Sequence, residues 1–261
     1  MALKAVEGGK KATKRTAVSD AEWQTRVELA AAYRLTAHFG MDLLAFNHLS
    51  ARVPDQRDRV LLNPFGLLFD QIRASDLVKV DFEGNIVEDT EWQINPAAIA
   101  LHCGVPEARE DINSVMHFHT TAGVTVSLHP EGLLPLALDG IQYIPQTAYH
   151  ELEGVTINED ERTSLIRDLG HKSILFLRNH GTAICGTSVA EAFMKAYIVE
   201  KACQIQVAAL SQGVPPLRAS DNMVGMISGQ FQSVVDNAGI AEIQFESLMR
   251  MLDAKDPSYR N

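Results

Sequence analysis

The stretch SVMHFHTTAG, residues 114–123, places two histidines two residues apart inside an apolar run. Successive side chains of an extended strand point to opposite faces, so His117 and His119 share one face while Met116 and Phe118 share the other. Two imidazoles on one face either bind a cation together or repel each other when protonated, and neutral imidazole is the commonest metal ligand in proteins. The pattern predicts a metal site on a buried strand, provided that a third ligand lies elsewhere in the chain.

The third ligand is expected in the segment SILFLRNHGTAICG, residues 173–186. Here His180 follows an apolar strand and stands directly before Gly181 and a second short strand. Ligands of open α/β sheets gather at strand ends. Taken alone, a histidine in this position is more often a hydrogen-bonded loop residue than a ligand. Together with His117 and His119 it offers three neutral nitrogens and leaves a coordination position free for a substrate, which is typical of a catalytic metal site.

Composition narrows the class of partner. The 261 residues carry a net charge of −10, which disfavours nucleic acid and anionic membranes and leaves small molecules and other proteins. The three cysteines have no paired spacing, so a disulfide framework is not expected. We therefore expect the protein in a reducing compartment, the cytoplasm. Since no segment approaches eighteen uninterrupted apolar residues, no membrane span is expected.

Periodicity predicts helices alternating with short strands. Ser19 and Glu22 have the spacing of a capping box, and apolar residues four apart continue the helix until Gly40. Further helices are expected after Asn95, after the histidine pair, before Gly170, from Ser188 to about Gly213 and in the tail, with a loop-rich passage at 133–153 and a hairpin over 77–87. We interpret residues 1–18 as a disordered basic arm and residues 19–261 as one domain with a C-terminal helical tail.

Over residues 20–215 the chain resembles the class II aldolase/adducin family. The resemblance rests on segments in the family's order: FNHLSARVP, LLNPFGLLF, LVKVDFEGNIV, INPAAIALH, VMHFHT, AYHELEG, LFLRNHGTAICG and VAEAFMKAYIVEKACQIQ. It implies an α/β fold, a three-layer αβα sandwich with a mixed central sheet. It also implies a homotetramer with active sites at subunit interfaces, and a divalent metal, usually zinc, on His117, His119 and His180.

Two positions depart from the sugar-phosphate branch of this family. That branch has a segment of the type S-S-E, whose serines help to bind phosphate and whose glutamate acts as base at the metal. The aligned segment here is NPAA, residues 95–98, so Ala98 stands at the glutamate position and can take no proton. Phe65 stands where a small polar residue is expected before the glycine of NPFG, and it offers no hydrogen bond. Both departures argue against a sugar-phosphate aldolase and favour the adducin-like bacterial branch.

The resemblance also supplies candidates for the rest of the site. Tyr149 and His150, in the expected loop AYHELEG, are the candidate acid and base, although such a pair is more often a packed surface feature. His48 either meets the acid group of the substrate or braces its loop. His102 is expected to be structural or to support the site from behind its ligands. Arg178 pairs with the substrate or, more commonly for a strand-end arginine, with an acidic side chain. The predicted substrate-binding residues are Asn47, His48, Ser50, Asn63, Gly66 and Asn95.

These observations predict a divalent-metal-dependent C–C lyase that acts on a small oxygenated or hydroxy acid through a metal-stabilised enolate. Decarboxylation is slightly favoured over aldol cleavage, because loss of CO₂ does not begin with removal of a C–H proton. The expected metal is Zn²⁺, with Fe²⁺, Mn²⁺, Co²⁺ and Ni²⁺ as alternatives. Two other functions stay open: a non-haem iron oxygenase on the same fold, known from two antibiotic-pathway relatives, and a non-catalytic, adducin-like binding domain.

Overall fold

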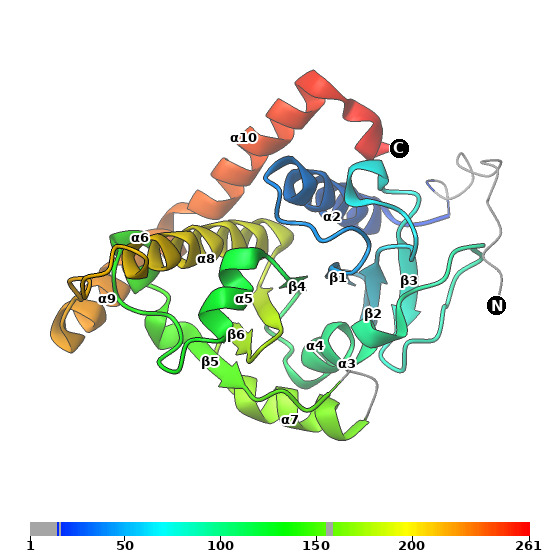
Figure 1. Ribbon diagram of the computed structural model, residues 1–261. Coiled ribbons are helices and arrows are strands. Elements are labelled where there is room, and N and C mark those ends of the chain that lie inside the picture. The colour runs from blue at the N-terminus through cyan, green and yellow to red at the C-terminus, as the bar shows by residue number, and fades with distance from the viewer. Residues whose placement is uncertain (1–14, 16, 155–158) are drawn as a thin grey trace.

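The computed structural model describes residue 15, residues 17–154 and residues 159–261. Most of the predicted basic arm, residues 1–18, therefore lies outside the described residues. The described chain folds into a single seven-stranded sheet with helices on both of its faces (Figure 1). This arrangement is α/β with a mixed sheet, as the sequence predicts.

The sheet has the order β3-β2-β1-β4-β7-β6-β5. All neighbouring strands are antiparallel except β5 and β6, which run parallel. The strands are β1 (His48–Val53), β2 (Gln56–Leu62), β3 (Val78–Asp81), β4 (Ser114–Phe118), β5 (Thr147–His150), β6 (Ile174–Leu177) and β7 (Gly181–Gly186). The strand that carries the histidine pair, β4, lies at the centre of the sheet, where both of its faces are covered.

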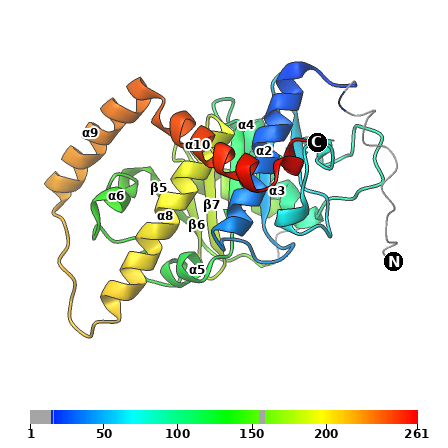
Figure 2. The ribbon, with the colours of Figure 1, turned by 90° about the horizontal axis from the view of Figure 1, so that it is seen from above.

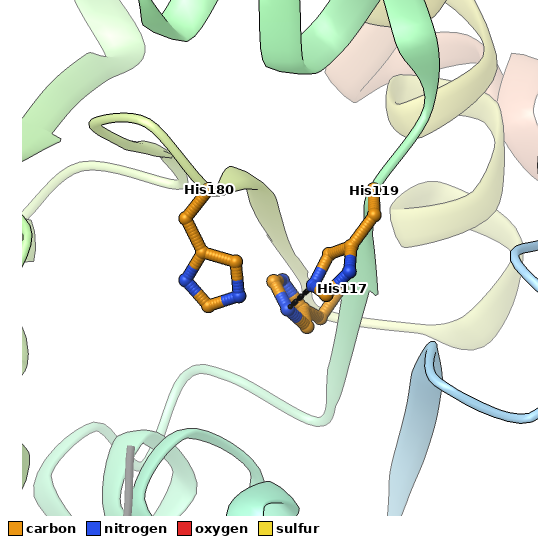
Figure 3. Close-up of side chains that lie close together, drawn as sticks. All are labelled: His117, His119 and His180. Atoms are coloured by element: carbon orange, nitrogen blue, oxygen red, sulfur yellow. Dashed lines mark hydrogen bonds between the residues drawn. The ribbon is translucent and has the colours of Figure 1, made fainter. Parts of the chain in front are cut away.

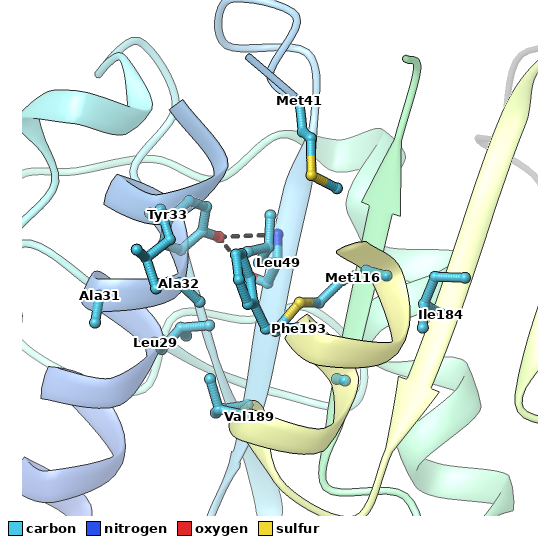
Figure 4. Packing of buried hydrophobic residues seen from close by; sticks show 14 of the residues in the cluster. Leu29, Ala31, Ala32, Tyr33, Met41, Leu49, Met116, Ile184, Val189 and Phe193 are labelled. Carbon is cyan, nitrogen blue, oxygen red and sulfur yellow. Dashed lines mark hydrogen bonds between the residues drawn. The ribbon is translucent and has the colours of Figure 1, made fainter. Parts of the chain in front are cut away.

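One face of the sheet packs against α2 (Asp20–His38), α5 (Thr121–Ser127) and α8 (Val189–Leu210), and α10 (Ile240–Lys255) packs on α2 and α8. Leu49, Met116 and Ile184 project from three strands toward Phe193 of α8 (Figure 4). Tyr33 of α2 is fully buried there, and its hydroxyl accepts a hydrogen bond of 2.9 Å from the Leu49 N–H. This layer holds the largest apolar cluster among the described residues, so it anchors the central strands on this face of the sheet.

The opposite face packs against α3 (Ile99–His102), α4 (Gly104–Ala108) and α7 (Glu159–Leu169). Val115, Leu175 and Ala183 point to this side and meet Leu101 of α3 and Leu165 of α7. Side chains alternate along a strand, so residues two positions from Val115 also face this layer. His117 therefore faces α3 and α7 rather than the large core.

Several predicted elements are confirmed. The Ser19 side chain accepts a hydrogen bond from the Glu22 N–H at the start of α2. In the same way Ser188 caps α8, the long helix that ends at Leu210. Apolar periodicity and the capping residue agree at both sites, which is why the sequence predicted these helices well.

Two other expectations are corrected, and a third is confirmed. The passage at 133–153 contains β5 and the short helix α6 (Leu138–Ile141), so it is not simply loop. The helix expected after Asn95 is split into a 3₁₀ turn (Pro96–Ala98), α3 and α4. The hairpin expected over 77–87 is confirmed: Val80 and Ile86 form an antiparallel bridge, and the N–H groups of Asp81 and Val87 donate to the carbonyls of Asn85 and Lys79. Each of these elements is short, and short segments carry weak periodicity.

The tail is helical, as expected, with α9 (Asp221–Ala238), α10 and a final 3₁₀ turn (Pro257–Arg260). Figure 2 shows α10 lying across α2 and α8, while α9 extends away from the sheet. None of the helices in the described residues combines the length and apolar character that a membrane crossing needs.

A buried ion-pair network joins α2 to β3. The guanidinium of Arg26, fully buried, donates to Glu22 at 2.8 Å, to Glu88 at 2.8 Å and to the Leu77 carbonyl at 2.8 Å. The Lys79 ammonium donates to the second oxygen of Glu22 at 2.6 Å. Every charge in this network has a partner, so removal of one member leaves another buried charge uncompensated.

Arg26→Ala is therefore expected to lower the free energy of unfolding by about 3–5 kcal/mol, measured by urea denaturation. The matched control is Arg250→Ala, since Arg250 pairs with Glu246 at 3.9 Å on the exposed surface. That change is expected to cost less than about 1 kcal/mol. Equal losses from the two variants would contradict a structural role for the buried network.

Candidate metal centre and its pocket

Three histidines meet at one end of the central strands. His117 lies in β4, His119 follows that strand directly, and His180 lies in the turn between β6 and β7 (Figure 3). The Nε2 atoms of His117 and His119 are 2.7 Å apart. The ring centroids are separated by 4.6 Å for His117 and His119, 4.9 Å for His117 and His180, and 4.7 Å for His119 and His180. One nitrogen from each ring lies within 4.8 Å of the others, a spacing that can hold a metal ion.

The turn before β7 brings His180 to the pair on β4. Asn179 has a left-handed φ of 61°, and the N–H of His180 donates to the Leu177 carbonyl at 3.1 Å. Gly181 then passes so close to β4 that an added Cβ would lie 2.2 Å from the Phe118 carbonyl oxygen. Only glycine fits this approach, so Gly181 allows His180 to reach the cluster.

A hydrogen bond fixes the orientation of the buried ligand. Nδ1 of His117 lies 3.0 Å from the Thr182 carbonyl oxygen, which can only accept. The proton is therefore on Nδ1, and the lone pair is on Nε2, the atom that faces His119. Burial, followed by the charges of neighbouring histidines, lowers the pKa of His117 well below its ordinary value and that of His119 to about 4. Neutral rings with convergent lone pairs are the donors that a divalent ion such as zinc requires, so this residue set fits a metal.

The cluster lies in a pocket of about 380 Å³, the size of a small-molecule site. Histidines form its floor, and apolar side chains from α3, α7 and the 43–46 segment form much of its wall. Its apolar lining residues include Leu43, Phe46, Leu101, Leu152, Leu165 and Leu177. A ligand that contacts the histidines would therefore also contact hydrocarbon.

Two of the six predicted substrate-binding residues line this pocket, His48 and Asn95. His48 pairs with His117 across β1 and β4, and its Nε2 lies 2.9 Å from Nδ2 of Asn95, which can donate to it. Burial, then the charges of His119 and His180, lowers the pKa of His48 to about 4. His48 is therefore a neutral ring beside the cluster.

Three of the other four predicted substrate-binding residues make hydrogen bonds within the chain. Ser50 is buried, and its Oγ lies 2.8 Å from Nδ1 of His102. Asn47 accepts a hydrogen bond from the Leu43 N–H, and Asn63 accepts one from the Tyr33 hydroxyl. Asn47, Ser50, Asn63 and Gly66 are absent from the pocket lining found in the described residues. His102 is fully buried, contacts Ser50 and lines the pocket, a placement that matches the supporting role that the sequence left open.

The two candidate acid–base residues lie on opposite faces of β5. His150 lines the pocket, and its Nδ1 lies 2.7 Å from Oδ2 of Asp168 on α7. Tyr149 faces the other layer, where its ring stacks on Phe176 and its hydroxyl accepts a hydrogen bond of 2.9 Å from the Leu133 N–H. Burial raises the pKa of Tyr149. Within this chain the structure brings His150, but not Tyr149, to the three histidines.

Arg178 lies at the pocket, but most of its donors are taken. Its two terminal nitrogens donate to the carbonyls of Ser127, His129 and Pro130, and its guanidinium lies 4.4 Å from the Tyr149 ring centroid. Glu151 is 3.9 Å from its Nε. Of the alternatives that the sequence left open, the structural role matches these contacts.

The segment NPAA lies at the pocket with Ala97 facing it. Ala98 instead packs with Val60, Leu62 and Val78 in a small apolar cluster. Ala98, where the sequence predicted the missing carboxylate, is therefore absent from the pocket lining found in the described residues. The chemical conclusion is unchanged, because a methyl group stands at either position.

Sequence patterns missed Asp168 as a member of the site. It lies eighteen residues after His150 in the chain, on a polar helix whose acidic residues all look alike in the sequence. Leu165 and Asp168 are three residues apart and share one face of α7. Only the packing of α7 on β5 separates Asp168 from the other carboxylates of that helix.

The comparison with family models agrees with this geometry. Residues 27–207 match the model of the class II aldolase and adducin N-terminal domain. A Caulobacter vibrioides protein with a provisional aldolase class 2 name is 44% identical over 93% of this chain and 94% of its own length. Alpha-adducin of Rattus norvegicus is 38% identical over 87% of this chain, which spans 33% of that longer protein.

Solved structures give the same picture. An aldolase II superfamily protein from Pseudomonas syringae has a TM-score of 0.91 and 39% identity, over 95% of this chain and 100% of its own. L-fuculose 1-phosphate aldolase from Glaciozyma antarctica has a TM-score of 0.77 at 24% identity, over 92% and 93% of the two chains, a likeness of fold. The chain belongs to the class II aldolase and adducin family.

Proposed function

We propose that this protein is a divalent-metal-dependent C–C lyase that acts on a small oxygenated acid. The observation that carries the proposal is the convergence of His117, His119 and His180 on one point at the base of a pocket. Three neutral nitrogen ligands leave a position open for a substrate oxygen, as in catalytic zinc sites. Zinc is the proposed ion, since the three ligands include no carboxylate.

Each residue has a proposed role that its contacts support. His117, His119 and His180 would hold the metal, and the Thr182 carbonyl keeps His117 in the tautomer that a ligand needs. When bound, the metal would act as a Lewis acid for the negative charge that appears as a C–C bond breaks. His48 and Asn95 would contact the substrate, and His150 would move a proton. Tyr149 is left without a role inside this chain's pocket.

A phosphorylated sugar is a poor match for this pocket. Among the described residues that line it, Arg178 has the one permanently cationic side chain, and its terminal nitrogens already donate to main-chain carbonyls. Glu151 and Glu161 add negative charge to the lining. A phosphate dianion would therefore meet more carboxylates than available cations, which favours a smaller acid.

A non-catalytic, adducin-like binding domain is the second candidate. The 38% identity to alpha-adducin favours it. The histidine cluster argues against it, because three convergent imidazoles, one of them buried, serve no evident purpose in a surface that only binds proteins. The iron oxygenase is less well supported, since the usual iron triad combines two histidines with a carboxylate.

We also propose a homotetramer in the cytoplasm with pockets at subunit interfaces. The exposed apolar residues Leu43, Phe46 and Leu152 line the pocket's outer part, where a neighbouring subunit would cover them. A closed symmetric assembly would bury the same patch on every copy.

Metal analysis tests the cluster. The protein purified without chelator is expected to contain about one zinc ion per chain, and the double variant His117→Ala/His119→Ala should contain almost none, because one remaining imidazole cannot hold the ion. Metal content would be measured by inductively coupled plasma mass spectrometry. His171→Ala, at an exposed position outside the cluster, is the control and should keep its metal. Undiminished metal in the double variant would refute the assignment.

Product analysis tests the reaction class. A screen of hydroxy acids and catechol-type carboxylates is expected to show release of CO₂ or of an aldehyde by the zinc-loaded protein. Treatment with a chelator should abolish that release, and added zinc should restore it. Consumption of oxygen in the presence of iron would favour the oxygenase instead. A metal-free protein that turns over none of these acids would favour the binding domain.

A further inference from the structure

His150 and Asp168 form a hydrogen-bonded pair that metal binding by the three histidines does not require. The His150 side chain is 3% exposed, and its Nδ1 lies 2.7 Å from the Asp168 carboxylate. Burial raises the pKa of Asp168, but hydrogen bonds from Arg167 and His150 outweigh that effect and leave the pKa below its ordinary value. An ionised carboxylate can only accept, so the proton of this bond belongs to Nδ1 of His150.

The second nitrogen of the same ring is left with a lone pair. Nε2 of His150 is buried and has no hydrogen-bond partner among the described residues. A buried polar atom without a partner costs free energy, so such an atom calls for an explanation. Since His150 lines the pocket, a ligand that brings a hydroxyl group to Nε2 would supply the missing partner.

A backbone hydrogen bond holds His150 close to the three clustered histidines. The carbonyl of His150 accepts a hydrogen bond of 2.8 Å from the Arg178 N–H, at the start of the turn that carries His180. In the sheet order the cluster strands β4 and β7 lie between β1, which carries His48, and β5, which carries His150. His48 and His150 thus flank the cluster from two sides of one pocket. Within the described part of the chain, His48 meets the amide of Asn95, whereas His150 meets the carboxylate of Asp168.

We propose that His150, oriented by Asp168, is the base that removes a hydroxyl proton, and that the reaction is aldol cleavage of an unphosphorylated 4-hydroxy-2-oxo acid. This inference rests on the proposed function and goes further by choosing aldol cleavage over decarboxylation. Decarboxylation does not begin with removal of a proton, so it gives the His150 and Asp168 pair no role in the first step. A base within the pocket also supplies what the alanines of NPAA lack.

The step balances without any oxidant or reductant. The O–H bond of the 4-hydroxyl breaks, and its proton goes to Nε2 of His150. The oxygen's electron pair forms the aldehyde C=O as the bond between C3 and C4 breaks, and the electrons of that bond remain on the 2-oxo acid fragment as an enolate. The imidazolium then returns its proton to C3, which leaves the 2-oxo acid, an aldehyde and a neutral His150. Asp168 stays ionised throughout and acts as a positioning residue.

The pocket wall indicates the other end of the substrate. Leu101 of α3, Leu165 of α7 and Leu177 of β6 line the space beside the histidines. Leu165 lies on the same helix face as Asp168, so the group attached to C4 would lie against hydrocarbon once its hydroxyl meets His150. An apolar or aromatic substituent fits this wall better than a phosphate does.

The tautomer of His150 can be measured without any substrate. In protein labelled with ¹⁵N-histidine, long-range NMR correlations at pH 8 are expected to show Nδ1 protonated and Nε2 unprotonated for His150, assigned by comparison with His150→Gln. In Asp168→Asn the signal should move toward the Nε2–H tautomer, because an amide can donate to Nδ1, whereas Asp168→Glu should keep the original tautomer. An Nε2–H tautomer in the unaltered protein, or no change in Asp168→Asn, would overturn the inference.

Product analysis with a defined probe tests the chemistry. The zinc-loaded protein is expected to convert 4-hydroxy-2-oxo-4-phenylbutanoate to benzaldehyde and pyruvate. His150→Gln and Asp168→Asn should lower kcat by about 100-fold or more with little change in KM, while Asp168→Glu should recover part of it. His171→Gln, an exposed matched control, should behave as the unaltered protein.

The outcomes separate the two proposals. A zinc-loaded protein that does not cleave the probe, or that releases only CO₂ at a rate insensitive to His150→Gln, overturns the base assignment and leaves the metal site intact. A protein that fails to retain metal overturns the proposed function. Benzaldehyde release that depends on His150 and Asp168 supports both.

Discussion

Three imidazole rings meet because β4 and β7 lie side by side in antiparallel register, with His117 opposite Ala183 and Phe118 opposite Thr182. That register brings the Thr182 carbonyl to Nδ1 of His117. It also lets the turn before Gly181 deliver His180 to the same point. A slip of one residue would send His117 to the large apolar core on the other face. The site thus depends on sheet register, which the buried apolar residues of both faces hold in place.

Burial disfavours protonation of the clustered histidines and keeps their rings neutral, which suits them to metal binding. Desolvation, followed by repulsion among the rings, lowers the pKa values of His48, His117, His119 and His180. A divalent ion would stabilise this neutral form by accepting the lone pairs that now face one another. The Asp168 carboxylate lies at the margin of the site, where it orients His150 and does not occupy a ligand position.

The sequence predicted those parts of the site that follow from local periodicity. His117 and His119 share a face because strand side chains alternate, and His180 stands out because an apolar strand ends just before it. The contacts of Asp168, Tyr149 and Ala97 depended on packing that no local pattern records. Alternation within β5 separates Tyr149 from His150, but a strand of four residues has too little periodicity to be distinguished from a loop in the sequence. Helices α2 and α8 can be predicted from the sequence because the capping residue and the apolar periodicity agree at both.

The central claim is that His117, His119 and His180 bind one metal ion together. X-ray absorption spectroscopy of the zinc-loaded protein tests it most directly. The expected spectrum shows three imidazole nitrogens at about 2.0–2.1 Å and one or two further light-atom ligands, with no sulfur. Loss of His180 alone should reduce the imidazole count by one. A spectrum with sulfur ligands, or one unchanged in His180→Ala, would contradict the account.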